Sequence, residues 1–385
     1  MKKKILRFLS YVLVAALTCV LTLVISGNYQ RIWPDSKLLE LETLLEQYYA
    51  DDVDLKQLED AAANAMVEAL PDRWSYYISA EDYAAYLENK NNAYVGIGVT
   101  VQSRENGLEI IKVAENGGAH TAGIMVGDII IGVDGVTTEE KTVDEISTMI
   151  KGEEGTFVEL KVLRLGDTMT VSVERKLIRT PVATATMLEN NVGLVTIANF
   201  NTNCASESIA AVEQLLSQGA TALIFDVRNN GGGYTAEMVK LLDHLLPEGD
   251  LFRTVDYSGK EKVETSDASF VDVPMAVLVN GNSYSAAEFF AAALEEYEAA
   301  MILGEKTSGK GFYQITYRLS DGSAVAISSG RYYTPKGVSL EGVGLTPKGE
   351  YYVQVDEATA NAIYNGTLPP MEDPQILAAL AALGR

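Results

Sequence analysis

Two side chains of this sequence form a candidate nucleophile and its base. Ser285 lies in the run Asn280-Gly-Asn-Ser-Tyr-Ser-Ala-Ala-Glu288, and Lys310 follows 25 residues later between two glycines. A serine hydroxyl attacks a carbonyl when a neighbouring base takes its proton, and a lysine is such a base when burial favours its neutral amine. No histidine lies in either segment. The pair therefore indicates acyl-transfer chemistry that does not use a histidine base.

The candidate nucleophile and a glycine run each follow an apolar stretch. Ser285 stands at the predicted start of a helix, where unpaired backbone N–H groups and the helix dipole favour a developing negative charge. The run Asp226-Val-Arg-Asn-Asn-Gly-Gly-Gly233 exposes main-chain N–H groups, which suits an oxyanion hole. Each feature also has a simpler interpretation, because serine is a common helix N-cap and three glycines form a flexible turn.

The segment around Lys310 nearly matches a phosphate-binding loop. It reads Gly304-Glu-Lys-Thr-Ser-Gly-Lys-Gly311, but a Ser or Thr would have to follow the lysine and a helix would have to begin there. The next residues, FYQITYRL, are aromatic and β-branched and predict a strand instead. Nucleotide binding is therefore not favoured, and no cofactor is expected.

Strands and helices are predicted to alternate between residues 180 and 350. Buried strands are predicted from apolar, β-rich stretches at 192–198, 220–227, 274–280 and 300–305. Helices are predicted from periodic apolar residues at 206–219, 235–244 and 285–297. This alternation is typical of a mostly parallel sheet, whose site is built by the loops after the carboxyl ends of its strands. The three segments described above all lie in such loops.

Residues 94–178 predict a separate, strand-rich module. The segment has glycines at short intervals, β-branched runs and one amphipathic helix. Its phrase GGAHTAGIMVGDIIIGVDG resembles the PDZ domains of bacterial proteases. An ordinary β-hairpin with glycine turns is the alternative.

The PDZ resemblance implies a peptide-binding loop. Backbone N–H groups of the loop would hold a C-terminal carboxylate, and the strand that follows would pair with the peptide. The loop residues are Val95, Gly96, Ile97, Gly98 and Val99. The other wall of the groove is predicted to be the helix bearing Val143, Ile146 and Ile150, which favours an apolar last residue.

Together, the loop segments resemble those of the C-terminal processing peptidases, also called tail-specific proteases. In that family a run of small residues and serines carries the nucleophile, and a GK-G-x-x-Q segment carries a lysine and a glutamine. The resemblance implies that Ser285 is the nucleophile, Lys310 the general base and Gln314 the residue that orients the lysine. It also implies oxyanion positions at Gly232 and Ala286.

The resemblance covers the chain from about residue 40 to its end, with three departures. It includes the segments Asp72-Arg-Trp-Ser-Tyr-Tyr77, Tyr332-Tyr-Thr-Pro335, Gly344-Leu-Thr-Pro347 and Glu372-Asp-Pro-Gln375. Gly231 stands where the family often has proline, and Lys348 stands where it usually has Asp. Tyr284 lies beside the nucleophile and is expected to narrow the pocket.

The predicted architecture is a multi-domain α/β protein. The resemblance implies a βαβ-type serine peptidase core of the crotonase/Clp-like kind. The expected parts are a transmembrane anchor at 8–26, a helical N-terminal region at 35–93, a PDZ domain at 94–178, a Ser/Lys peptidase core at 180–350 and a C-terminal helical segment at 351–385.

The N-terminus has the pattern of a membrane anchor. Four cations, Lys2, Lys3, Lys4 and Arg7, precede eighteen residues without a charge, Phe8–Ile25. At ~1.5 Å per residue, a helix of this length spans most of a hydrocarbon core about 30 Å thick. The cationic flank stays in the cytoplasm, so the body is expected on the extracytoplasmic side of the cell membrane. A cleavable signal peptide is the alternative.

The composition limits the partners. The chain has 30 Lys and Arg against 53 Asp and Glu, a net charge of −23. Such a protein repels nucleic acid, because phosphate binding needs clustered cations. Two cysteines, Cys19 and Cys204, and two histidines are too few for a zinc-cysteine or three-histidine centre, so no metal is expected. Apolar helices at both ends, with the family resemblance, suggest a homodimer.

The predicted function is an extracytoplasmic serine endopeptidase. It would recognise protein or peptide substrates with apolar C-termini through the PDZ domain and cleave them with a Ser285–Lys310 dyad. The alternative is a proteolytically inactive PDZ scaffold that only binds its partners.

Overall fold

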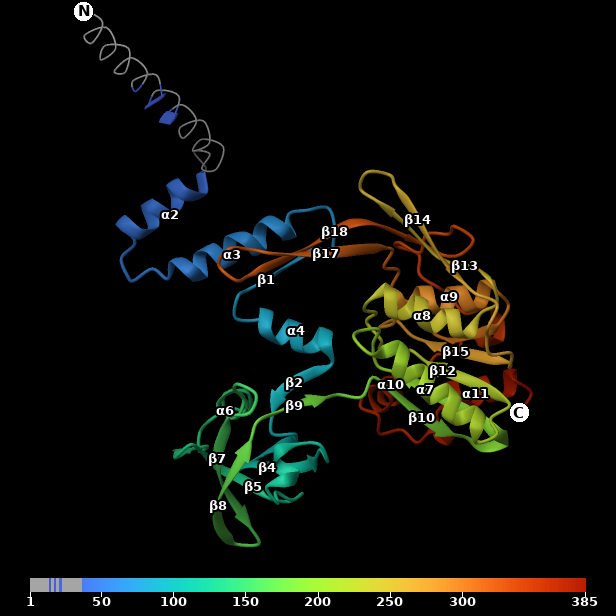
Figure 1. Ribbon diagram of the computed structural model, residues 1–385, viewed down its shortest axis with the longest axis horizontal. Coiled ribbons are helices and arrows are strands. Elements are labelled where there is room, and N and C mark those ends of the chain that lie inside the picture. The colour runs from blue at the N-terminus through green and yellow to red at the C-terminus, as the bar shows by residue number, and fades with distance from the viewer. Residues whose placement is uncertain (1–13, 15–16, 19–20, 23–36) are drawn as a thin grey trace, which may run out of the picture. The chain divides into compact units, whose positions relative to one another are not determined.

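The computed structural model describes residues 14, 17–18, 21–22 and 37–385 (Figure 1). The predicted anchor at 8–26 lies outside the described residues, apart from those five positions. Within the described part of the chain, no helix has the length and apolar character needed to cross a bilayer. The chain divides into two compact units, Met1–Arg73 and Trp74–Arg385.

The first unit contains a pair of helices, as the apolar pattern of residues 35–70 predicts. α2 spans Lys37–Tyr48 and α3 spans Leu55–Glu68. Asp54 starts α3, because its side chain accepts a 3.1 Å hydrogen bond from the backbone N–H of Gln57. Four leucines of α2 remain 41–52% exposed, namely Leu38, Leu39, Leu41 and Leu44. The pair therefore keeps an apolar surface of its own.

A six-stranded antiparallel sheet forms the module predicted from residues 94–178. Its strands are β3 (Val99–Arg104), β4 (Gly107–Val113), β5 (Ile129–Val133), β6 (Val136–Thr137), β7 (Phe157–Arg164) and β8 (Asp167–Glu174). Its helices are α5 (Gly118–Thr121) and α6 (Val143–Ile150). β2 (Ala93–Gly96) and β9 (Lys176–Arg179) pair where the chain enters and leaves the module. α6 begins at Thr142, which forms a capping box with Glu145.

The second sheet is the mostly parallel one that the alternating pattern predicts. Its order is β10 (Ala183–Met187), β11 (Val192–Ile197), β12 (Ala222–Asp226), β15 (Met275–Val279) and β16 (Ala300–Gly304), and only β10 is antiparallel. The connecting helices are α7 (Cys204–Ser217), α8 (Thr235–Leu245) and α9 (Ala286–Glu296). A short 3₁₀ turn, Glu189–Asn191, joins β10 to β11.

Both faces of this sheet are covered, which explains why its strands are apolar throughout. Successive strand residues point to opposite faces. One face packs with α7, α8 and α9 and includes Leu223, Phe225, Val277 and Val279. The other packs with α11 (Pro374–Ala382) and includes Ala222, Ile224, Ala276 and Leu278. The C-terminal segment predicted at 351–385 thus supplies a layer against the mostly parallel sheet, because Ile376, Ala379 and Leu380 bury their side chains there.

A further antiparallel sheet was not predicted as a unit. It joins β1 (Tyr76–Ile78), β13 (Gly249–Asp256), β14 (Glu261–Ser266), β17 (Phe312–Arg318) and β18 (Ala324–Tyr333). β1 pairs with β18, and α4 (Tyr83–Asn91) lies in the same compact unit. The prediction of one helical N-terminal region at 35–93 is therefore wrong from Trp74 onward. The remaining elements are α10 (Glu357–Tyr364) and the 3₁₀ turns Gly349–Tyr351 and Pro370–Glu372.

Candidate active site

Ser285 lies in the turn between β15 and α9, at the carboxyl end of a buried parallel strand. Its φ is 59° and its ψ is −127°, a conformation that costs a non-glycine residue about 1–3 kcal/mol. The residue is 6% exposed. Hydrolases present a serine nucleophile on this kind of strained turn from strand to helix. The strain indicates that Ser285 does more than begin a helix.

Glu288 links the turn of Ser285 to the loop of Lys310. Its side chain is fully buried, and its carboxylate accepts hydrogen bonds from the backbone N–H groups of Ser285 (2.9 Å), Gly309 (2.7 Å) and Lys310 (2.8 Å) and from the Thr307 hydroxyl (2.5 Å). Burial raises the pKa of the Glu288 carboxyl, and these donors oppose that shift by stabilising the carboxylate. One side chain therefore fixes both backbone segments that carry the predicted nucleophile and base.

Glycines flank Lys310 because no side chain fits at either position. Gly309 has a φ of 79°, and a Cβ there would lie 2.9 Å from the backbone nitrogen of Gly344. At Gly311 a Cβ would lie 2.8 Å from the Cβ of Glu341, whose carboxylate accepts a 2.6 Å hydrogen bond from the Gly311 N–H. The near match to a phosphate-binding loop thus has a packing explanation.

The ammonium group of Lys310 lies against two aromatic rings. Its Nζ is 5.1 Å from the ring centroid of Trp74 and 5.8 Å from that of Tyr284, and the two rings stack 6.3 Å apart. Trp74 Nε1 donates to the carboxylate of Glu341 at 3.1 Å and 3.3 Å. Cation–π attraction favours the charged amine, whereas a general base has to be neutral.

Ser285, Lys310 and Gln314 line one cavity of about 340 Å³. Half of the other ten lining residues are tyrosines, namely Tyr76, Tyr83, Tyr86, Tyr234 and Tyr332. The structure therefore brings together the three side chains to which the sequence assigned nucleophile, base and orienting roles.

Gln314 lies on β17 with its amide nitrogen in use. Nε2 donates to the carbonyl of Phe312 at 3.2 Å and to the hydroxyl of Ser328 at 3.0 Å. The carbonyl oxygen is then the atom of this side chain suited to accept a hydrogen bond from Lys310 Nζ. That Gln314 orients Lys310 stays a prediction.

The glycine run lies beside the nucleophile, but Gly232 is engaged elsewhere. Its N–H donates a 2.9 Å hydrogen bond to Asn230 Oδ1, and the glycines that line the cavity are Gly231 and Gly233. Ala286 is the first residue of α9 and is fully buried. An oxyanion role for Gly232 requires Asn230 to release that amide, so the assignment of Gly232 and Ala286 stays a prediction.

Gly231 and Tyr284, two positions at which the chain departs from the family pattern, lie close together. A Cβ at Gly231 would lie 2.6 Å from the Tyr284 hydroxyl oxygen. The tyrosine beside the nucleophile therefore occupies the space that a proline at position 231 would need. This contact fits the expectation that Tyr284 narrows the pocket.

Arg228 anchors the start of the glycine run in the core. The side chain is 3% exposed, and its guanidinium pairs with Asp226 at 2.6 Å and with Asp373 at 2.8 Å and donates to Gln375 at 2.8 Å. Burial lowers the pKa of Arg228, but the two carboxylates outweigh burial and raise it overall. The C-terminal segment that includes Asp373 thus holds the loop next to the nucleophile.

Replacing Arg228 with methionine is expected to destabilise the core by about 3–5 kcal/mol, because it leaves two buried carboxylates without their cation. Urea unfolding followed by tryptophan fluorescence measures the loss. Lys348→Met is the matched control, since it removes an ion pair whose lysine is 80% exposed and should cost no more than about 1 kcal/mol. Equal losses in the two variants would contradict the anchoring role.

Neither histidine lines the cavity. His120 lies on α5 of the antiparallel module, and His244 ends α8 with its Nε2 3.1 Å from Glu213. In the described ranges, no group of three or more His, Cys, Asp or Glu side chains is arranged to hold a metal ion.

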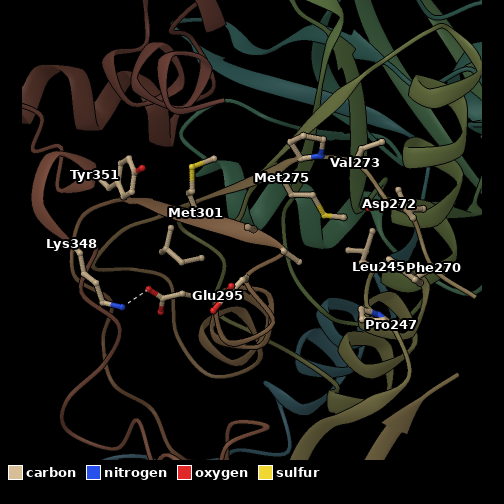
Figure 2. Close-up of a pocket in the computed structure, with 16 residues that line it drawn as sticks. Leu245, Pro247, Phe270, Asp272, Val273, Met275, Glu295, Met301, Lys348 and Tyr351 are labelled. Atoms are coloured by element: carbon tan, nitrogen blue, oxygen red, sulfur yellow. Dashed lines mark hydrogen bonds and ion pairs between the residues drawn. The ribbon is translucent and has the colours of Figure 1, made fainter. Parts of the chain in front are cut away.

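A larger cavity of about 660 Å³, drawn in Figure 2, has neither Ser285 nor Lys310 in its lining. Its lining includes Met275 and Ala300, the first residues of β15 and β16, whereas Ser285 and Lys310 follow the ends of those strands. Lys348, another lining residue, pairs with Glu295 of α9 at 2.8 Å, which raises the pKa of the lysine. The departure at position 348 thus forms a surface ion pair.

The predicted peptide-binding loop, Val95–Val99, lies between β2 and β3. β3 pairs only with β4 among the described strands, so its other edge is open, as the sequence predicts. Ile146 and Ile150 of α6 are 1% and 7% exposed and pack in the core of the module, so these two side chains offer little surface to a ligand. That α6 forms the other wall of the groove stays a prediction. Carboxylate binding by the loop stays a prediction.

Sequence reasoning missed Glu288, Trp74 and Glu341. Glu288 had a signal, because Ser285-x-x-Glu288 has the spacing of a capping box. Trp74 and Glu341 had none, since their contacts join segments 267 residues apart.

Comparisons with known proteins agree with this fold. The PDZ domain model matches residues 95–174, and the model of peptidase family S41 matches residues 191–351. The carboxy-terminal processing protease CtpA of Bacillus subtilis is 30% identical over 360 residues, covering 90% of this chain and 77% of that protein. A probable CtpA-like serine protease of Staphylococcus epidermidis is 31% identical over 310 residues, covering 80% of this chain and 63% of the relative.

A solved structure gives the same relationship. The photosystem II D1 C-terminal processing protease superposes with a TM-score of 0.50 at 26% identity, covering 89% of this chain and 98% of that one. The match to peptidase family S41, the PDZ domain and the relatives named as serine proteases define the class as a serine-type peptidase. The chain belongs to peptidase family S41, with the C-terminal processing proteases.

Proposed function

We propose that this chain hydrolyses peptide bonds with a Ser285–Lys310 dyad, close to C-termini that its PDZ domain captures. The observation that carries the proposal is the shared cavity. Both residues line it, and each lies on a loop that follows one of the neighbouring parallel strands β15 and β16. Glu288 ties the two loops together through the backbone N–H groups of both residues.

The proposed reaction needs no group beyond these residues and water. Neutral Lys310 Nζ takes the hydroxyl proton while Ser285 Oγ bonds to the substrate carbonyl carbon, whose oxygen becomes an oxyanion. The C–N bond then breaks as the protonated lysine gives its proton to the leaving amine. Water, deprotonated by the same lysine, next attacks the acyl group, and Ser285 leaves with the proton.

The test is whether the chain itself cuts internal peptide bonds. Full-length protein in detergent is incubated with an unfolded protein, and mass spectrometry maps the products. We expect cleavage within the C-terminal region of the substrate and a covalent adduct of a sulfonyl fluoride on Ser285. Intact substrate and no adduct would favour the alternative, a PDZ scaffold without peptidase activity.

Capture of a free C-terminus is a separate part of the proposal. The open edge of β3 and the amides of the Val95–Val99 loop support it. A peptide with an apolar free C-terminus is expected to protect β3 amides from hydrogen exchange in full-length protein carrying Ser285→Ala. An amidated copy keeps the side chains and loses the charge, so equal protection by both peptides would contradict capture by the loop.

We propose an extracytoplasmic location, with the chain held at the cell membrane through residues 8–26. The cations before that apolar run and its length support the proposal. Self-association as a homodimer is also proposed, on the exposed leucines of α2. Protease added to whole cells and sedimentation of the purified protein test these two points.

A further inference from the structure

Lys90 is a second lysine in the active-site cavity, and the mechanism does not use it. It lies in the last turn of α4 and lines the cavity together with Ser285 and Lys310. Its Nζ is 5.7 Å from the ring centroid of Tyr86 and 5.7 Å from that of Tyr234. Nothing in the sequence pattern distinguishes this lysine from the chain's other cations.

The core fixes the position of Lys90. Thr202 donates two hydrogen bonds to the Lys90 carbonyl, from its backbone N–H at 3.2 Å and from its hydroxyl at 3.0 Å. Next to it, Asn92 and Asn199 exchange side-chain hydrogen bonds of 3.1 Å and 2.9 Å. The end of α4 is therefore attached to the loop that follows β11, and the lysine is held on a rigid wall.

The charge around Lys90 is unusual for this protein. Acidic residues outnumber basic ones by 53 to 30, yet the cavity lining contains two lysines and no Asp or Glu. In the part of the chain that the structure describes, no carboxylate forms a salt bridge with Lys90. Two tyrosine faces orient the ammonium but do not neutralise it. Such a site selects an anionic group of the ligand.

We propose that Lys90 binds a carboxylate of the peptide substrate inside the cavity and so sets which bond Ser285 attacks. The inference rests on the proposed function, because it takes the ligand to be a peptide. A peptide offers carboxylates from two sources, its C-terminus and its Asp or Glu side chains. The chemistry is the same for both, and the experiment distinguishes them.

The experiment compares four versions of one peptide in full-length protein. The C-terminus of the peptide is either free or amidated, and the residue next to the cleaved bond is either Asp or Asn, which gives four combinations. Lys90→Met keeps the length of the side chain and removes its charge, and Lys90→Arg keeps the charge. A hydrogen bond to a charged group contributes about 1.5–3 kcal/mol, so Lys90→Met should lower the preference in kcat/KM for a carboxylate about 10–100-fold, mainly through KM.

The pattern identifies the source. If Lys90→Met abolishes the preference for the free over the amidated C-terminus, Lys90 binds the C-terminal carboxylate. If it abolishes the preference for Asp over Asn, Lys90 binds the side-chain carboxylate. Lys90→Arg should keep most of the preference. Lys260→Met, which removes a cation from an exposed turn, is the matched control and should leave the preference unchanged.

Two results would overturn the proposal: an unchanged preference in Lys90→Met, or an equal loss for all four peptides, which indicates a structural role. Calorimetry repeats the comparison in protein carrying Ser285→Ala, where binding is measured without turnover. Wild-type protein that binds carboxylate peptides through Lys90 without cleaving them would refute the peptidase proposal and the choice of the cleaved bond, and would support only carboxylate binding by Lys90. Cleavage by wild-type protein, together with an unchanged carboxylate preference in Lys90→Met, would support the peptidase proposal and refute the role of Lys90.

Discussion

Replacing Ser285 with alanine is expected to lower kcat/KM for peptide hydrolysis by at least about 10⁴-fold. The substitution removes the only atom of this residue that can bond to the substrate carbonyl. It keeps the Cβ and the backbone N–H that donates to Glu288, so the strained turn and the cavity should persist. The measurement is cleavage of a fluorogenic peptide over a wide range of enzyme concentration.

Two observations make this result specific to the nucleophile. Circular dichroism of Ser285→Ala should match the wild type, and unfolding should show no more than the loss of the serine hydroxyl as a helix cap, about 1 kcal/mol. Residual hydrolysis above about one ten-thousandth of the wild-type value would show that another nucleophile acts in the cavity.

Lys310→Met is expected to cause a loss of about 10³-fold or more, since it removes the proposed base and keeps a side chain of similar length. In the wild type the rate should rise with pH, because only the neutral amine accepts a proton and the rings of Trp74 and Tyr284 favour the charged amine. The pH–rate profile of both proteins checks this prediction.

The double variant His120→Gln, His244→Gln is the control for the base. Neither histidine lines the cavity, so the variant should keep the wild-type pH profile. A profile that lost its rise near neutral pH in this variant would refute the assignment of Lys310.

The sequence by itself determined the elements and the chemistry-bearing loops. Strands β12 and β15 were predictable because both of their faces are buried, which requires apolar residues at every position. The loops of Ser285 and Lys310 were predictable because strand, turn and helix signals are local, and parallel strands place their carboxyl ends at one edge of the sheet. Even the tie through Glu288 has a local signal, the spacing of a capping box.

Only the tertiary structure decided what surrounds these two residues. Trp74, Lys90 and Tyr234 come from segments far from Ser285 in sequence, and they meet it in one unit only after the sheets pack. The hydrogen bond from the Gly232 N–H to Asn230 could not be predicted from the sequence pattern. The same holds for the burial of Ile146 in the core of the PDZ domain, because the apolar period of a helix does not say what the helix packs against. The periodicity of apolar residues shows which face of a helix or strand is apolar. Long-range packing decides which other element covers that face. For this reason the excess of positive charge in the cavity of an acidic protein appears only in the folded chain.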